Sequence, residues 1–154
     1  MTDRILFVDD DSHALEAYKR LLHSEFTIET ALSGSEGLAK IQVLGPFAVV
    51  ISDMLMPGMN GAEFLAKVRE ASPRTVRMLL TGYKDLDRAI EAVNEGQIFR
   101  YLAKPCGKSV LVSAIQLGLA QHKANVEDGQ LIKEAKYRRL DAVKRGSYEV
   151  ILSE

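Results

Sequence analysis

Carboxylate, hydroxyl and ammonium groups follow four short apolar segments of this 154-residue chain. They belong to Asp9, Asp10 and Asp11 after residues 4–8, Asp53 after residues 47–52, Thr81 at the end of residues 75–81, and Lys104 after residues 98–103. Crowded carboxylates repel one another, and burying them unpaired is costly. A hard divalent cation such as Mg²⁺, which prefers oxygen ligands, would relieve that repulsion. A carboxylate nucleophile, a metal ion and charge-stabilising donors are the components of phosphoryl transfer.

The segments around these groups predict the elements that would position them. Short β-prone runs predict strands at residues 4–8, 26–31, 47–52, 75–81 and 98–103. Amphipathic segments predict helices at residues 12–23, 33–42, 62–71, 85–94 and from 108 to at least 121, with Ser12 and Ser33 as N-caps. Strict alternation of strand and helix predicts an α/β fold, with a parallel sheet covered by helices on both faces. Ligands of such sheets bind beyond the carboxyl ends of the strands, which is where the polar groups occur.

Each of these polar residues also has an ordinary structural explanation. A single acid after a strand is usually a cap or a turn residue, and Asp11, directly before the first helix, fits that explanation. A single threonine at a strand end reflects β-propensity, and a single Lys-Pro pair is typical of a loop. The argument for chemistry therefore depends on the joint pattern, in which each group follows the expected strand in the expected order.

Composition restricts the classes of protein to which the chain can belong. It is 47% hydrophobic and 27% charged, with a net charge of -1, so no strong electrostatic footprint for nucleic acid is expected. No apolar stretch is long enough to cross a membrane, and no signal peptide is recognisable. The single cysteine, Cys106, excludes an intrachain disulfide and fits a reducing compartment. We therefore expect a cytoplasmic protein.

Four motifs make the chain similar to a known family. They are ILFVDDD at residues 5–11, VVISDMLMPGMNG at 49–61, MLLTGY at 78–83 and YLAKP at 101–105. Over about residues 1–122 the sequence resembles the receiver domain of a bacterial two-component response regulator. The resemblance implies a flavodoxin-like, doubly wound five-stranded sheet with strand order 2-1-3-4-5. It also divides the chain into a receiver domain, residues 1–122, and a helical linker or the start of an output segment, residues 123–154.

The resemblance assigns the acids and one carbonyl to a phosphorylation site that uses Mg²⁺. Asp9 and Asp10 match the acidic pair that holds the ion, Asp10 more directly and Asp9 largely through water. Asp53 matches the phosphorylated aspartate, which is also a metal ligand. The backbone carbonyl of Leu55 matches a further ligand. The side chains of Leu55 and Tyr83 flank this site at positions that are often polar in the family, and we expect them to hinder attack of water on the acyl phosphate.

The other matched positions form the switch. Thr81 matches the hydroxyl that moves toward the phosphoryl group, and Tyr101 matches the aromatic residue that follows it, although plain packing would also explain Tyr101. Lys104 matches the lysine that neutralises the phosphoryl charge. The Lys104–Pro105 bond is expected to be cis. Phosphorylation would then change the surface formed by the fourth helix, the fifth strand and the fifth helix.

The expected partners follow from the same resemblance. A sensor histidine kinase or a phosphotransfer protein would donate the phosphoryl group, and the chain would not be a conventional enzyme because it turns over no separate substrate. Residues 94–106 are loosely similar to receivers joined to HD-type cyclic-dinucleotide phosphodiesterases and to some transcriptional activators. An output domain beyond residue 154 is therefore expected, and a homodimer is a further option.

Two other functions and the role of the C-terminal segment stay open from the sequence. Clustered acids with Mg²⁺ also serve metal-dependent phosphatases, but these usually carry a second aspartate two residues after the nucleophile, where this chain has Leu55. A phosphorylation-independent interaction domain is disfavoured by the intact set of acids, threonine and lysine. Residues 133–145 contain six basic and two acidic residues in a helix-forming composition. A signalling or dimerising helix and a solvated linker are equally compatible with them, and nucleic-acid binding is the weaker reading.

Overall fold

The computed structural model describes residues 3–94 and 98–144, except for the side chains of residues 83, 93, 94 and 130–144. Its five strands are β1 (Arg4–Val8), β2 (Thr27–Ala31), β3 (Val49–Ser52), β4 (Val76–Thr81) and β5 (Arg100–Ala103). All neighbouring strands pair in parallel. They form one sheet in the order β2-β1-β3-β4-β5, which confirms the predicted topology.

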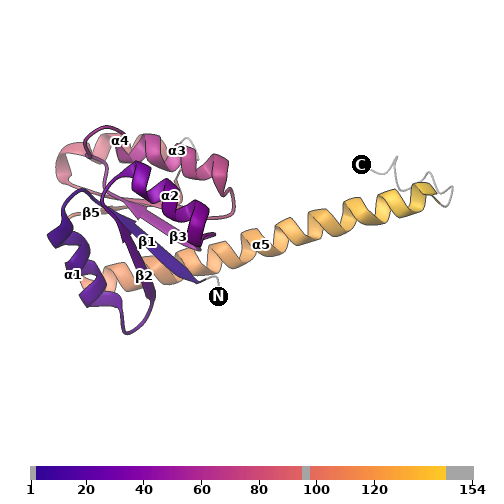
Figure 1. Cartoon of the computed structure of the whole chain (residues 1–154), viewed down its shortest axis with the longest axis horizontal. Coiled ribbons are helices and arrows are strands. Elements are labelled where there is room, and N and C mark those ends of the chain that lie inside the picture. The colour runs from indigo at the N-terminus through magenta and orange to yellow at the C-terminus, as the bar shows by residue number, and fades with distance from the viewer. Residues whose placement is uncertain (1–2, 95–97, 145–154) are drawn as a thin grey trace. The chain divides into compact units, whose positions relative to one another are not determined.

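The helices alternate with these strands as the sequence predicted (Figure 1). They are α1 (Ser12–Leu22), α2 (Gly34–Leu44), α3 (Gly61–Ala71), α4 (Leu86–Asn94) and α5 (Lys108–Lys144), with a short 3₁₀ turn, η1 (Tyr83–Asp85), before α4. Figure 1 shows α1 and the first turns of α5 on one face of the sheet, with α2, α3 and α4 on the other.

The alternating side chains of β1 explain why both faces are covered. Ile5 and Phe7 point to the face where α1 and α5 pack, and Leu6 and Val8 point to the face of α2, α3 and α4. All four side chains are at most 1% exposed. A strand that is apolar on both sides cannot tolerate water on either face, so it needs helices on both.

Side-chain caps fix where three of the helices begin. Asp11, and not Ser12, is the N-cap of α1, with its Oδ1 accepting from the backbone N–H of His13 at 3.0 Å. A carboxylate satisfies the free amides there and also interacts favourably with the helix dipole. Ser33 caps α2 as predicted, and its Oγ accepts from Glu36 N at 3.1 Å. A full capping box, which the sequence analysis missed, joins Asn60 to Glu63 at the start of α3.

The last helix extends well beyond the predicted minimum of residue 121. α5 runs without interruption to Lys144 and passes through Gly129, although glycine costs about 1 kcal/mol relative to alanine inside a helix. By contact density the chain divides into two compact units, Met1–His122 and Lys123–Glu154. Within the first unit, the Nδ1 of His122 lies 3.0 Å from the carbonyl oxygen of Arg74.

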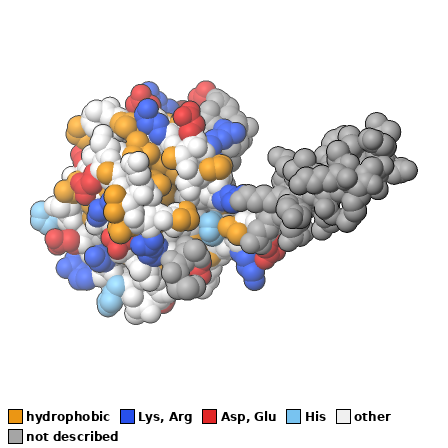
Figure 2. Space-filling model, turned by 45° about the vertical axis from the view of Figure 1, so that its right-hand side comes forward, with side chains coloured by type: hydrophobic (Ala, Val, Ile, Leu, Met, Phe, Trp, Pro, Cys, Tyr) orange, Lys and Arg blue, Asp and Glu red, His pale blue; other side chains and the backbone are white. Residues whose placement is uncertain are grey.

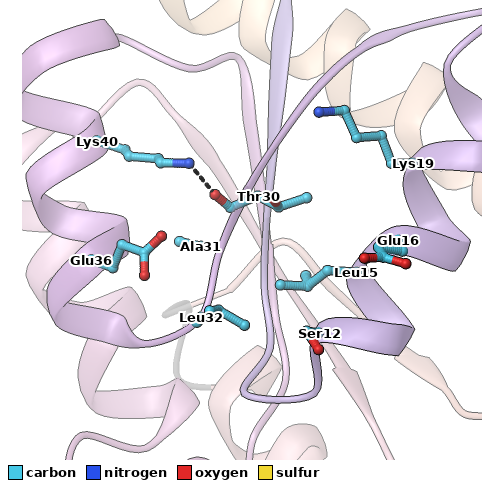
Figure 3. Close-up of a pocket in the computed structure, with 9 residues that line it drawn as sticks. All are labelled: Ser12, Leu15, Glu16, Lys19, Thr30, Ala31, Leu32, Glu36 and Lys40. Carbon is cyan, nitrogen blue, oxygen red and sulfur yellow. Dashed lines mark hydrogen bonds between the residues drawn. The ribbon is translucent and has the colours of Figure 1, made fainter.

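The free edge of the sheet at β2 is partly protected by a lysine. The N–H of Asp9 donates to the carbonyl of Ala31, so Ala31 faces β1 and the neighbouring Thr30 faces the open edge. Lys40 reaches from α2 and donates to the Thr30 carbonyl in the pocket between α1 and α2 (Figure 3). A lysine placed here blocks an acceptor that could otherwise pair with another strand.

The surface shows no large field of one charge on the face drawn in Figure 2. Acidic and basic side chains are interspersed there with polar and apolar ones. Within the described residues, no helix combines the length and the apolar composition that crossing a bilayer requires.

Candidate functional site

The backbone holds the predicted site residues at the carboxyl ends of adjacent strands. Asp9 follows β1, Asp53 follows β3, Thr81 ends β4 and Lys104 follows β5. Hydrogen bonds continue the sheet one residue past these ends, since Asp53 N donates to Val8 O at 2.9 Å and Lys104 N donates to Thr81 O at 2.8 Å. The site therefore sits on the rigid part of the fold and not on a free loop.

Lys104 bridges the two acids that come from different strands. Its Nζ lies 3.2 Å from Oδ2 of Asp9 and 3.3 Å from Oδ1 of Asp53. The two carboxylates are largely enclosed, with side chains 4% and 14% exposed, whereas the lysine side chain is 32% exposed. One ammonium therefore offsets part of the repulsion between two buried acids.

The remaining carboxylate oxygens decide what else the site can bind. Oδ1 of Asp9 accepts from the N–H of Asp11 at 3.0 Å, and Oδ1 of Asp53 accepts from Met54 N at 3.0 Å. Among the described residues, none makes a hydrogen bond or ion pair to Oδ2 of Asp53. This oxygen is the atom of the cluster that is left for a new bond.

Asp9, Asp10 and Asp53 form an all-oxygen cluster that suits a divalent cation. One carboxylate oxygen from each lies within 4.8 Å of the others. Asp9 is buried, Asp53 is intermediate and Asp10 is exposed, so the cluster opens to solvent on one side. Mg²⁺ binds through one or two carboxylates and keeps several waters, which fits a cluster with one open side.

Comparison with known proteins identifies the family. The family model described as the response regulator receiver domain matches residues 5–116. The chain belongs to this family. HoxA, a hydrogenase transcriptional regulatory protein of Cupriavidus necator, is 37% identical over 112 residues, which cover 73% of this chain and 23% of HoxA. FleR of Pseudomonas aeruginosa is 32% identical and covers 91% of this chain, but this chain covers only 30% of FleR. This chain therefore spans only 23% to 30% of the length of these two curated relatives.

Solved structures show the same fold. A structure described as adenylate cyclase from Rhodopirellula baltica is 46% identical with a TM-score of 0.83, covering 86% of this chain and 98% of that one. The signal receiver domain of an HD domain-containing protein from Pseudomonas fluorescens is 32% identical with a TM-score of 0.73, covering 80% of this chain and 99% of that one. Transcriptional regulators and an HD domain protein, the two types of relative expected from the sequence, both occur among the matches.

Within the described residues, the hydroxyl groups of the two predicted switch residues, Thr81 and Tyr101, make no hydrogen bond to the acids of the cluster. Thr81 is fully buried, and its hydroxyl makes a long contact of 3.5 Å to the carbonyl of Gly82. Such a contact is too weak to hold the hydroxyl in one orientation. Tyr101 is half-buried and packs against the apolar cluster under α2, α3 and α4. The Lys104–Pro105 peptide bond is cis, as the resemblance implied.

The two residues predicted to flank the site are Leu55 and Tyr83. The Leu55 side chain is 55% exposed in the loop after Asp53. Its carbonyl, predicted to be a metal ligand, is the backbone group two residues after Asp53, and that role stays a prediction. The side chain of Tyr83 lies outside the described residues.

Burial makes the charge of Asp53 costly. Desolvation is the largest influence and raises the pKa of its carboxyl; Lys104 lowers it, and the charge of Asp9 raises it again. For Lys104, burial favours loss of the proton, but Asp53 and Asp9 outweigh it and raise the pKa of the ammonium. The two pKa shifts are compatible, because Lys104 is shared between two acids and its charge offsets only part of the cost of burying Asp53.

This shift predicts a pH-dependent difference in stability between the receiver and its Asp53→Asn variant. The pKa of the Asp53 carboxyl is higher in the folded state than in the unfolded state, so the folded state binds this proton more tightly. Folding stability is therefore lost as the pH rises from the unfolded pKa through the folded pKa and the carboxyl ionises. Asparagine cannot ionise, so in metal-free buffer at about pH 7.5 we expect the variant to melt a few degrees higher. The difference should shrink near pH 4, where Asp53 approaches protonation. Thermal melts at both pH values measure it, and a variant less stable than the parent at both would contradict the argument.

Gly61 contributes to the site in a way that the sequence analysis missed. The predicted helix began at residue 62, but Gly61 is the first residue of α3, and its N–H donates to Met54 O at 2.8 Å. A Cβ at this position would lie 2.1 Å from the carbonyl oxygen of Asp53. The absence of a side chain therefore lets α3 begin directly against the backbone that carries Asp53.

We expect Gly61→Ala to displace the backbone of Asp53, because the clashing atoms belong to the main chain and cannot rotate away. The change should cost about 1–3 kcal/mol of folding free energy and weaken Mg²⁺ binding. Urea unfolding and a Mg²⁺ titration measure the two effects. Gly107→Ala is the control, since a Cβ there meets nothing within 4 Å. Equal effects of the two substitutions would show that the close approach at Gly61 is unimportant.

Proposed function

We propose that the receiver is a phosphoacceptor switch in which Asp53 takes up the phosphoryl group, with Mg²⁺ held by Asp9, Asp10, Asp53 and the carbonyl of Leu55. The observation that carries this proposal is the unengaged Oδ2 of Asp53, beside an ammonium 3.3 Å from the other oxygen of the same carboxylate. The oxygen-only cluster of three acids supports the choice of ion.

The geometry supports an in-line transfer to Asp53. Its Oδ2 forms a bond to phosphorus while the bond from phosphorus to the donor atom breaks, and the donor leaves with that electron pair. Lys104, already at the carboxylate, neutralises charge on a phosphoryl oxygen, and the N–H of Met54 fixes the orientation of the nucleophile. Mg²⁺, when bound, would supply further positive charge to the phosphoryl oxygens. Asp9 keeps Lys104 in position from the side of β1.

A phosphoryl group on Asp53 would also provide the signal. It adds nearly two negative charges and strong acceptors, to which the loosely held Thr81 hydroxyl and Lys104 can donate. Inward movement of Thr81 leaves space at the end of β4 that Tyr101, on the neighbouring strand, can enter. The surface of α4, β5 and α5 changes with it, and phosphorylation must supply a few kcal/mol of bias between the two states.

The proposed partners are a sensor histidine kinase or a phosphotransfer protein as donor. Residues 1–122 would form the receiver domain, and residues 123–154 a helical linker or the beginning of an output segment, with the output domain beyond residue 154. The continuous helix to Lys144 favours a signalling or dimerising helix over a solvated linker. We propose a cytoplasmic protein that is not a conventional enzyme and whose receiver does not itself bind nucleic acid.

A phosphatase-like hydrolase is the alternative that the same acids could serve. Such hydrolases usually carry a second aspartate two residues after the nucleophile, but here that position is the exposed, apolar Leu55. A phosphorylation-independent interaction domain would gain nothing from an acid cluster bridged by Lys104. Both alternatives are therefore less well supported than the switch.

Beryllofluoride tests the proposal because it binds an aspartate as a mimic of the phosphoryl group. In the presence of Mg²⁺ we expect amide signals to shift at Asp53, Thr81 and Tyr101 in two-dimensional NMR spectra, and further along α4 and β5. The shifts should disappear when Mg²⁺ is chelated. No response in the parent protein, or the same response without Mg²⁺, would contradict the proposed site.

The exposed Leu55 predicts the lifetime of the acyl phosphate. An apolar side chain beside the phosphoryl group cannot orient a water molecule, so Leu55→Asn, which can, should shorten the half-life severalfold. Loss of radiolabelled phosphate after removal of the donor measures the half-life. Val43→Asn is a matched control, because Val43 is also an exposed apolar residue, 80% exposed on α2. An unchanged half-life in Leu55→Asn would contradict the hypothesis.

A further inference from the structure

Tyr18 is a residue of α1, and its side chain packs against β1, the strand that leads to Asp9. Its ring stacks on Phe7, with centroids 4.8 Å apart and an interplanar angle of 24°. Asp9 comes two residues after Phe7, directly beyond β1, and its N–H continues the pairing with Ala31, so the two side chains point to the same face of the sheet. The Tyr18 ring therefore occupies the space next to Asp9, on the face where α1 and α5 pack.

The electrostatic surroundings of the phenol are those of the acid site. Burial is the largest influence and raises the pKa of Tyr18; Lys104 is the strongest charged influence and lowers it, followed by Asp9 and Asp53, which raise it. Tyr18 in turn acts on Lys104, after Asp53 and Asp9. The phenol is therefore close enough to Lys104 and the two acids for their charges to act on it. Tyr18 also packs against the same apolar cluster as Cys106, which comes two residues after Lys104.

The hydrogen-bonding capacity of Lys104 leaves one position for such a group. An ammonium has three N–H donors. Two of them point to Oδ2 of Asp9 at 3.2 Å and to Oδ1 of Asp53 at 3.3 Å. A phenol oxygen can be bridged to the third by one water molecule, and α1 presents a phenol on the face that Asp9 shares.

We propose that Tyr18 is a positioning residue for Lys104: its phenol oxygen accepts from one water molecule that in turn accepts the third hydrogen of the ammonium, and this bridge holds the ammonium between the two carboxylates. This role deepens the proposed function, because a lysine fixed before the phosphoryl group arrives need not be ordered during the transfer. The chain thus uses a residue of the first helix, outside the four motifs, to support a residue that follows the last strand.

The Tyr18→Phe variant tests this role because it keeps the ring that stacks on Phe7 and removes only the hydroxyl. At saturating Mg²⁺ we expect the rate of phosphorylation by acetyl phosphate to fall about fivefold. Mg²⁺ affinity and melting temperature should stay close to those of the parent, since the acids and the stack are intact. Tyr137→Phe, on the part of α5 beyond His122, is the control for the chemical change itself and should have no effect.

A double-mutant cycle with Lys104→Ala shows whether Tyr18 acts through the lysine. Removing the hydroxyl should have no further effect on the rate once the ammonium is absent. An equal loss in both backgrounds, or no loss in the parent background, would overturn the proposal.

A second readout does not depend on phosphorylation. In ¹⁵N NMR spectra, hydrogen exchange of the Lys104 ammonium with water should be severalfold faster in Tyr18→Phe than in the parent. Unchanged exchange would overturn the role of Tyr18 whatever the rates show. A parent protein that takes up no phosphoryl group, but shows the faster exchange on substitution, would contradict the proposed function and leave the placement of Tyr18 supported.

Discussion

Replacing Asp53 with asparagine is expected to abolish phosphorylation while the fold persists. The asparagine amide keeps nearly the shape of the carboxylate and can still accept from the N–H of Met54, so the backbone after β3 should not change. It lacks the negatively charged oxygen that attacks phosphorus. Asp9, the other acid beside Lys104, has one oxygen engaged by the N–H of Asp11 and the other by the ammonium. Uptake of labelled phosphate from acetyl phosphate in the presence of Mg²⁺ should fall below detection, a loss of at least about 1,000-fold.

A matched control separates this loss from the removal of one negative charge. Asp3 is an exposed acid that precedes β1, at the opposite end of the strand from Asp9. Asp3→Asn should be phosphorylated like the parent. Circular dichroism of the Asp53→Asn variant should match that of the parent. Residual phosphorylation of Asp53→Asn at a rate near the parent's would mean that another residue is the acceptor.

Replacing Lys104 with alanine is the second change with a large expected effect. The substitution removes the donor that lies 3.2 Å from Asp9 and 3.3 Å from Asp53, so charge on the phosphoryl oxygens is no longer neutralised from this side. Loss of one such donor typically costs about 100-fold or more in rate. The two carboxylates also lose the cation that they share, so their mutual repulsion rises. We therefore expect slower phosphorylation together with a stability that depends more strongly on Mg²⁺.

The control for this variant is Lys108→Ala. Lys108 is close to Lys104 in sequence but pairs with Glu25 at 3.5 Å on the surface, where an ion pair contributes little. Its replacement should change the rate of phosphorylation by less than about twofold. Rapid mixing with acetyl phosphate at saturating Mg²⁺ measures both variants. If Lys104→Ala reacted as fast as Lys108→Ala, the ammonium would have no part in the transfer.

The fold could be predicted from the sequence because short β-prone runs mark the strands, and the inner strands β1, β3 and β4 are buried on both sides. The predicted boundaries are nevertheless too wide where a buried run is longer than its hydrogen-bonded part. Phe47 and Ala48 are completely buried but precede β3, and Ile98 is 5% exposed but precedes β5. Apolar character reports burial, whereas a strand is defined by pairing, and the two do not begin at the same residue.

The site could be predicted only as far as strand ends determine it. Parallel strands bring Asp9, Asp53 and Lys104 to one edge, so their convergence follows from the order of the elements. The bridging position of Lys104 between two acids depends on side-chain conformation and was not predictable from spacing. The close approach of Gly61 to Asp53 was hidden because glycine also marks ordinary turns.

The identity of helix caps and of helix faces was also ambiguous in the sequence. Asp11 and Ser12 are both good N-caps, and only the backbone conformation decides for Asp11. Tyr18 and Leu21 both belong to the amphipathic segment predicted as a helix at residues 12–23, and their spacing suits one face, but Leu21 is 36% exposed. An amphipathic period locates a face to within about one position, so it could not separate a residue near the acids from one at the solvent boundary.

Intact mass spectrometry after reaction with acetyl phosphate tests the central claim most directly. With Mg²⁺ present, we predict that the protein gains the mass of one phosphoryl group, that the gain requires Mg²⁺, and that peptide mapping after chemical trapping locates it at Asp53. A gain that persists after chelation of Mg²⁺, a phosphoryl group located on a different residue, or no gain at all would contradict the account.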